Sequence, residues 1–202
     1  MSDTHRPDRR ALDLVAYSQD GYFTARQARG CGFSPQLLAH HINSGRYERL
    51  RRGLYRLSGF PGSSHADVRA KWLAVGAERA VVSHESALEL HELSDVLPNS
   101  VHLLVSRDDR GIRSPSGTKL HTTSLPLAAS DVVTREGLRV TSPARSIVDA
   151  AQAGTQPKQI ALAVQHALAG GIATRGDLLK CAELRGGRVA ELIRRTLEET
   201  RS

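Results

Sequence analysis

The 202-residue sequence predicts an α+β fold in two parts, and three observations carry this prediction. Three short helical patterns followed by an arginine-rich hairpin pattern fill residues 9–57. Short apolar runs of strand character fill residues 80–140, and four helical patterns complete the chain. We therefore expect an N-terminal winged helix-turn-helix domain, followed by a mixed α/β domain with a mainly antiparallel sheet and a C-terminal helical tail.

The first three helices are predicted by the residues at their ends. Residues 9–18 carry apolar side chains at helical spacing, and the following Asp20-Gly21 favours a turn. Thr24 and Gln27 match a capping box, in which both side chains satisfy free amides at a helix start. Ser34-Pro35 is a second start signal, and Gly45 a stop. Three helices in about 40 residues indicate a helix-turn-helix.

The third helix has two different faces. Its apolar stripe predicts the buried side, and its opposite side carries Gln36, His40 and Asn43. Gln and Asn pair bidentately with adenine in the major groove, and His donates to guanine acceptors. Taken alone, this polar face is equally well explained as a solvated surface.

The segment after this helix predicts a hairpin, because residues 46–57 alternate around Gly53 with Leu50, Tyr55 and Leu57 at apolar positions. This hairpin would form the wing. Its arginines are suited to phosphate contacts, and Arg51 or Arg52 could enter a narrow minor groove. The candidate DNA-binding residues are therefore Gln36, His40, Asn43, Arg46, Arg49, Arg51, Arg52 and Arg56.

The charge of the chain is concentrated in the same segment. The net charge is +7, and residues 24–57 hold seven arginines against the single Glu48. A basic balance of this kind favours a polyanionic partner. No run of apolar residues reaches the length of a membrane span, and we expect no signal peptide and no membrane partner. Cys31 and Cys181 have no metal-ligand spacing, which excludes a zinc finger and fits a cytoplasmic location.

The Gly- and Ser-rich residues 59–64 predict a linker, so we place a winged-helix domain at 1–60 and an α+β domain at 64–202. In the second domain, Ser64 and Asp67 would cap a helix, and strands are expected at 80–82, 101–105, 118–123, 132–133 and 138–140. Helices are expected at 84–93, 142–153, 157–169, 174–184 and 187–199. The apolar stripe of the last helix favours packing on its own domain over a protein partner.

The second domain also contains residues that resemble a catalytic group: Ser83, His84, Glu85, Ser86 and His91. Their spacing argues against catalysis, because His84 and His91 are seven residues apart rather than four. We interpret the two serines as helix-start residues, and Arg145 with Asp149 as an ion pair across one helical turn. Phosphate-loop and nuclease patterns are absent from the sequence. We therefore predict no enzyme, no cofactor and no metal site.

Four stretches resemble the AbiEi-type antitoxins of bacterial toxin-antitoxin systems. They are Gly21-Tyr22-Phe23-Thr24-Ala25-Arg26-Gln27-Ala28 with Gly32; Arg49-Leu50-Arg51-Arg52-Gly53-Leu54-Tyr55-Arg56-Leu57; Val82-Ser83-His84-Glu85-Ser86-Ala87-Leu88; and Val140-Thr141-Ser142-Pro143-Ala144-Arg145-Ser146-Ile147-Val148-Asp149. The fourth departs from the family pattern at Ser146, where Thr is more usual.

The resemblance implies two activities. The winged helix would bind inverted repeats in promoter DNA and repress its own operon, and the second domain would neutralise a cognate nucleotidyltransferase-like toxin. The loop 107–113 or the helical tail is where toxin contact would be expected. The alternative is a winged-helix regulator whose second domain senses a ligand or dimerises, without a toxin. A nucleotidyltransferase-like neighbouring gene would favour the antitoxin.

Overall fold

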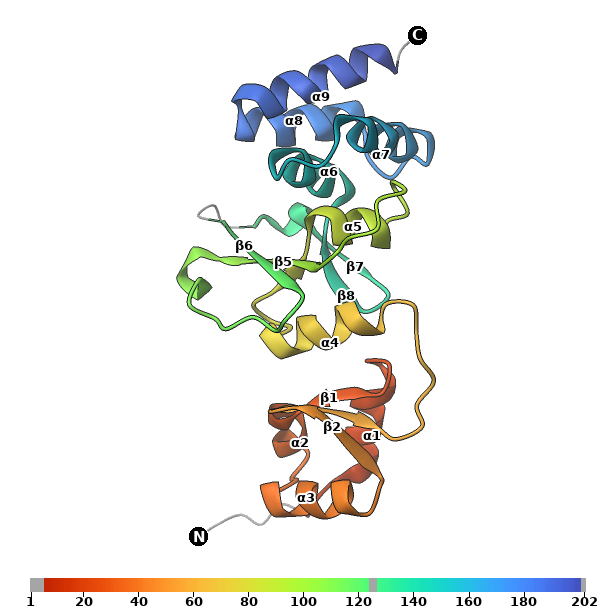
Figure 1. The fold of residues 1–202 in the computed structure, drawn as a ribbon, viewed down its shortest axis with the longest axis vertical. Helices are drawn as coiled ribbons and strands as arrows, with labels where there is room; N and C mark the ends of the chain where they lie inside the picture. Colours follow the sequence, from red (N-terminus) through yellow and green to blue (C-terminus); the bar gives the residue numbers. More distant parts are fainter. Residues whose placement is uncertain (1–5, 124–126, 201–202) are drawn as a thin grey trace. The chain divides into compact units, whose positions relative to one another are not determined.

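The computed structural model describes residues 6–123 and 127–200. The chain forms two compact units, the first ending at Gly76 and the second beginning at Ala77 (Figure 1). Each unit combines helices with its own sheet, which confirms the predicted α+β class. Among the described residues, no helix is both long enough and apolar enough to cross a membrane.

The first unit begins with a winged helix. Its elements are α1 (Arg9–Tyr17), β1 (Tyr22–Thr24), α2 (Ala25–Gly30), α3 (Pro35–Asn43), β2 (Tyr47–Arg51) and β3 (Leu54–Leu57). The three strands form an antiparallel sheet in the order β1-β3-β2. The helices lie within two residues of their predicted ends. Strand β1 was not predicted, since three residues have no resolvable periodicity and form a strand here by pairing with β3.

Aromatic side chains form the centre of this small core. Phe23 packs against Tyr47 and Tyr55, with ring centroids 4.9 and 5.5 Å apart. Leu12 of α1 and Leu38 of α3 are buried in the same cluster. Large rings bury much apolar area per residue, which is how a domain of about 50 residues holds three short helices against a sheet.

Helix α4 (Ala66–Val75) belongs to the first compact unit. Arg69 Nε donates to Asp20 Oδ2 at 2.6 Å, and Ser63 Oγ donates to the same oxygen at 2.8 Å. The compact unit therefore extends past the linker predicted at 59–64. The predicted cap by Ser64 and Asp67 is wrong, because α4 begins without a side-chain cap and Asp67 pairs with Lys71 instead.

The sheet of the second unit contains β4 (Val81–Val82), β5 (Val101–Ser106), β6 (Thr118–Thr123), β7 (Val132–Arg135) and β8 (Leu138–Thr141). Its order is β6-β5-β4-β8-β7. A mainly antiparallel sheet was predicted here, but the sheet is mixed: β4·β5 and β7·β8 are antiparallel, whereas β5·β6 and β4·β8 are parallel. Parallel strands are joined by a connection that crosses from one end of the sheet to the other. The alternation of apolar residues along each strand does not show where such connections run.

Helices of the second unit are α5 (His84–Leu90), α6 (Pro143–Gln152), α7 (Pro157–Ala169), α8 (Arg175–Arg185) and α9 (Gly187–Glu199). Two short 3₁₀ turns, η1 (Arg107–Asp109) and η2 (Ala129–Asp131), complete the unit. Helices α5 and α6 pack next to the sheet, with α7–α9 stacked beyond them (Figure 1). The apolar stripe of α9, including Ile193 and Leu197, is buried in this helical core, as predicted.

Candidate nucleic-acid interface

Helix α3 presents a polar face to solvent. Ser34 Oγ accepts from the Leu37 amide at 3.1 Å and Pro35 occupies the first turn, so both predicted start signals operate. Leu38 is buried, whereas Gln36, His40 and Asn43 are all exposed. The structure thus brings the three predicted base-reading side chains together on one accessible surface.

The hairpin β2–β3 forms the wing beside this helix. Gly53 adopts φ +81° in the turn, and its carbonyl accepts from the Ala25 amide at 2.9 Å, which ties the wing to the start of α2. The pairing slips between Arg49 and Arg51, so that the chain bulges at Leu50. As a result, the Leu50 side chain is 47% exposed, and the prediction that it lies on the apolar side of the hairpin with Tyr55 and Leu57 is wrong.

The wing arginines differ in how the fold uses them. The side chains of Arg46, Arg49, Arg51 and Arg52 are exposed. Arg56, by contrast, donates from Nη2 to the carbonyls of Phe60 and Pro61 at 3.0 and 2.9 Å. Its guanidinium also lies 5.1 Å from the centre of the Tyr22 ring. Arg56 therefore stabilises the domain from within. Counting charges in the sequence could not distinguish it from an arginine that contacts phosphate.

A shallow groove separates α3 from the wing. Arg29 of α2 and Arg49 of β2 both line it, with Pro35 and Ala39 of α3 between them. Arg29 was not among the predicted site residues. The sequence did contain one signal for it, since Arg29 is one of the seven arginines of residues 24–57. It was missed because the six-residue α2 is too short to show a clear polar face.

On the inner side of α3, the ring of the partly buried His41 packs against Tyr47, with ring centroids 5.2 Å apart. Burial lowers the pKa of His41, and the nearby charges of Arg46 and His40 lower it further. His41 is therefore neutral at pH 7 and supports the helix from the inside. His40, one residue earlier, points to solvent.

In the second unit, Ser83 is the N-cap residue of α5 and Ser86 lies in its first turn, as predicted, but neither side chain caps the helix. Ser83 Oγ lies 2.9 Å from Nδ1 of His84. Ser86 Oγ instead accepts from the His102 amide of β5 at 3.0 Å. His91 is buried and its Nε2 donates to the Thr141 carbonyl at 2.8 Å. These residues do not form a hydrolase triad, because the carboxylate of Glu85 faces His102 rather than His84.

Arg145 and Asp149 form the predicted ion pair, with Nε and Oδ2 2.9 Å apart. Arg185 of α8 donates to the other oxygen of Asp149, and Asp131 lies 3.4 Å from Nη1 of Arg145. Asp149 is 1% exposed. The network links α6, α8 and η2, so it stabilises the helical layer.

Comparisons with known proteins address the winged helix directly. Residues 10–58 match the family model described as "Transcriptional regulator, AbiEi antitoxin". This segment is similar to AbiEi-type regulators. The match confirms the resemblance that the motifs predicted, over the stretch from α1 to the end of the wing.

The whole fold also has a solved counterpart. The crystal structure of the RV2827C protein from Mycobacterium tuberculosis superposes with a TM-score of 0.61, covering 97% of this chain and 78% of that chain. The two sequences are 14% identical, so the similarity concerns the fold alone. No curated protein matches the sequence.

Proposed function

We propose that this protein is a DNA-binding repressor that acts on its own promoter through α3 and the wing. The family match supports a regulator of transcription. The observation that carries the finer proposal is the exposed face of α3, where Gln36, His40 and Asn43 lie next to a wing rich in exposed arginines.

The dimensions of α3 fit base reading in the major groove. Gln36 and Asn43 are seven residues apart, which corresponds to about 10.5 Å along a helix. Successive base pairs rise by about 3.4 Å, so the face spans about three of them. Ala39 is exposed between these polar residues, and its small side chain lets the helix backbone approach the bases.

The wing supplies contacts that do not depend on sequence. Arg46, Arg49, Arg51 and Arg52 would neutralise phosphates on either side of the bound groove. Arg29 of α2 lines the groove on the protein surface between α3 and the wing, and it would join them in contacting phosphates. We leave Arg56 out of this interface, because its guanidinium is engaged by Phe60, Pro61 and Tyr22.

A gel-shift titration separates base reading from phosphate contact. The full chain is titrated with the DNA upstream of its own gene and with a scrambled duplex of equal composition. Replacing Gln36, His40 and Asn43 together with alanine should remove the preference for the upstream DNA, since each bidentate base contact discriminates by about 1–3 kcal/mol. Affinity for the scrambled duplex should stay unchanged. A preference that survives the triple substitution would overturn the assignment of the reading face.

The second part of the proposal is neutralisation of a nucleotidyltransferase-like toxin by the second unit. It is supported by the family description of the winged helix and by the resemblance of the two stretches around His84 and Arg145. The apolar face of α9 packs within the unit, which argues against toxin contact through that face. The largely exposed loop 107–113 therefore remains the segment that we expect to contact the toxin.

Co-expression tests this second part. The toxin-like product of a neighbouring gene should arrest growth alone and be tolerated with this protein, and the two should co-purify. Tolerance without co-purification would indicate indirect neutralisation. If the chain gives no protection while still binding its promoter, the alternative holds, in which the second unit of a winged-helix regulator senses a ligand or dimerises.

A further inference from the structure

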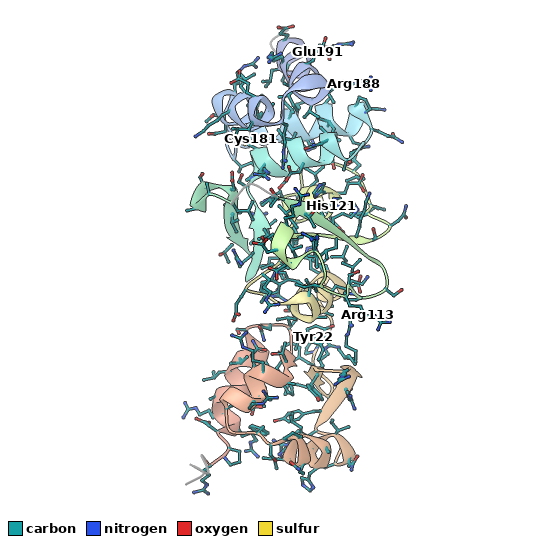
Figure 2. All side chains as sticks on the ribbon, turned by 90° about the vertical axis from the view of Figure 1, so that its left-hand side faces the viewer. Tyr22, Arg113, His121, Cys181, Arg188 and Glu191 are labelled. Carbon is teal, nitrogen blue, oxygen red and sulfur yellow. The ribbon has the colours of Figure 1, made fainter. Side chains whose placement is uncertain are left out.

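The second unit brings together three histidines that are far apart in the sequence. His84 is the first residue of α5, His102 lies in β5 and His121 lies in β6. One ring nitrogen from each falls within 4.8 Å of the others. His84 and His102 are buried at 7% and 5% exposure, and His121 is half-buried. Figure 2 shows His121 on the strands of the unit, with Cys181 apart from it among the helices.

Polar groups contact the rings of the cluster from outside. Ser83 Oγ lies 2.9 Å from Nδ1 of His84, which leaves Nε2 of that ring for another partner. Glu85 Oε2 lies 3.9 Å from Nε2 of His102, and Thr155 Oγ1 donates to the other Glu85 oxygen at 2.7 Å. The remaining nitrogen of His102, Nδ1, faces Nε2 of His121 at 3.3 Å.

This last distance suits a shared metal ion. Two imidazole nitrogens bound to Zn²⁺ at about 2.0–2.1 Å, with a tetrahedral angle between them, are about 3.3–3.4 Å apart. The carboxylate of Glu85 behind His102 corresponds to the outer partner that metal-binding histidines usually have. A hydrogen bond between His102 and His121 would account for the same distance but leaves the burial of His84 unexplained.

The conformation of His84 is a second sign of function. Its φ of +53° is one that residues other than glycine rarely adopt. Among the described residues Asp20, Glu92 and Glu136 share it, but only in His84 does it occur at a residue that delivers a ring to the cluster. Backbone of this kind persists where the surrounding structure requires it, which is most common at functional sites. Burial and the neighbouring histidines lower the pKa of His84 to about 2 and that of His121 to about 4, and burial also lowers the pKa of His102. Neutral imidazole is the form that binds metals.

We propose that His84, His102 and His121 bind one divalent transition-metal ion, with Zn²⁺ as the expected ion. The ligands would be Nε2 of His84, Nδ1 of His102 and Nε2 of His121. The His84 ring is stacked on His121 with centroids 3.5 Å apart and an angle of 15°, so both lone pairs cannot reach one ion as they stand. Binding therefore requires the His84 ring to rotate about its side-chain bonds.

Three histidines leave a fourth position for an exchangeable ligand. A polar cavity on the Glu85 side of His102 is lined by Glu85, His102 and Lys119, together with Asn99, Ser100 and Thr155, but not by His84 or His121. The ammonium group of Lys119, two residues before His121 in β6, favours an anion such as hydroxide or a small carboxylate as the fourth ligand. The site is independent of DNA binding and lies wholly within the second unit.

Titration of the untagged, chelator-treated full chain with Zn²⁺ tests the proposal by calorimetry. We expect one equivalent to bind, and Co²⁺ to give the visible absorption of a tetrahedral site. His121→Ala should weaken binding by more than the roughly 10–100-fold loss expected for Glu85→Gln, an outer-partner variant. His166→Ala is the matched control, because His166 is exposed on α7 outside the cluster.

The outcomes are decisive in either direction. Binding of less than one equivalent, or equal affinity in the wild type and His121→Ala, would overturn the site and leave a histidine hydrogen-bond cluster. If His121→Ala fails to fold, His121→Gln replaces it, and a rise in Tm on adding Zn²⁺ must occur in the wild type and His166→Ala but not in that variant. Gel shifts of the chelator-treated chain measure promoter binding separately, so loss of one property does not imply loss of the other.

Discussion

Replacing Arg51 and Arg52 with alanine removes two of the four exposed wing arginines that we assign to phosphate contact. Each phosphate neutralised on duplex DNA contributes about −0.9 to the slope of log affinity against log salt concentration. If each of the four side chains contacts one phosphate, together they contribute a slope of about −3.6, of which the double variant should retain about −1.8; a contact by Arg29 would add the same amount to both slopes.

These slopes convert into a measurable change. Between 50 and 200 mM salt, a slope of about −3.6 corresponds to a loss of about 150-fold in affinity, and a slope of about −1.8 to a loss of about 12-fold. The effect should be the same on the upstream and the scrambled duplex, because phosphates carry no sequence information. Gel shifts at four salt concentrations measure both slopes.

The matched control is the double substitution of Arg188 and Arg194, which are exposed on α9. Both double variants lower the formal net charge from +7 to +5, so any difference between them reports position rather than total charge. The control should keep the wild-type slope. An unchanged slope in Arg51→Ala/Arg52→Ala, or an equal fall in the control, would refute the assignment of the wing.

Two further predictions concern stability, measured by urea unfolding of the full chain. Asp149→Ala should destabilise the second unit by about 3–5 kcal/mol, because it leaves two arginines without their buried carboxylate. Asp67→Ala, which removes an exposed pair, should cost less than about 1 kcal/mol, and equal effects would contradict the role of the network. Gly21 and Gly53 both adopt φ near +80°, at +82° and +81°, so alanine at Gly53 should cost about 1–2 kcal/mol from the backbone alone. Alanine at Gly21 should cost about 1–3 kcal/mol more, since its Cβ would lie 2.5 Å from Phe60 Cγ; similar losses at both positions would show that no such contact exists.

Local signals predicted the helices well. The capping box of Thr174 and Asp177 forms as expected, with the Asp177 amide donating to Thr174 Oγ1 at 3.1 Å. Helix α8 begins directly after Thr174, at Arg175. The hairpin turn at Glu136 and Gly137 also forms, with both residues at positive φ. Such features depend on a few neighbouring residues, which is why the sequence alone reports them.

Features that depend on distant pairing were missed. The bulge at Leu50 arises from a slip against β3, and one extra residue turns that side chain outward. The histidine cluster requires the alignment of β5 with β6 and the approach of α5, none of which follows from the spacing of 84, 102 and 121. The predicted DNA-binding face was accessible to sequence reasoning because one helix and one hairpin carry it. Arg56 differs from the other wing arginines through contacts with the following loop and with the Tyr22 ring, which the sequence does not show.

The central claim is specific DNA binding by the winged helix, and a protection footprint on the DNA upstream of the gene tests it most directly. The account predicts discrete protected segments arranged as an inverted repeat, with half-site centres about 10–10.5 base pairs apart or a multiple of that. The Gln36, His40 and Asn43 triple variant should lose these segments at concentrations where it still binds DNA. Uniform protection by the wild type, or segments that persist in the triple variant, would contradict the claim.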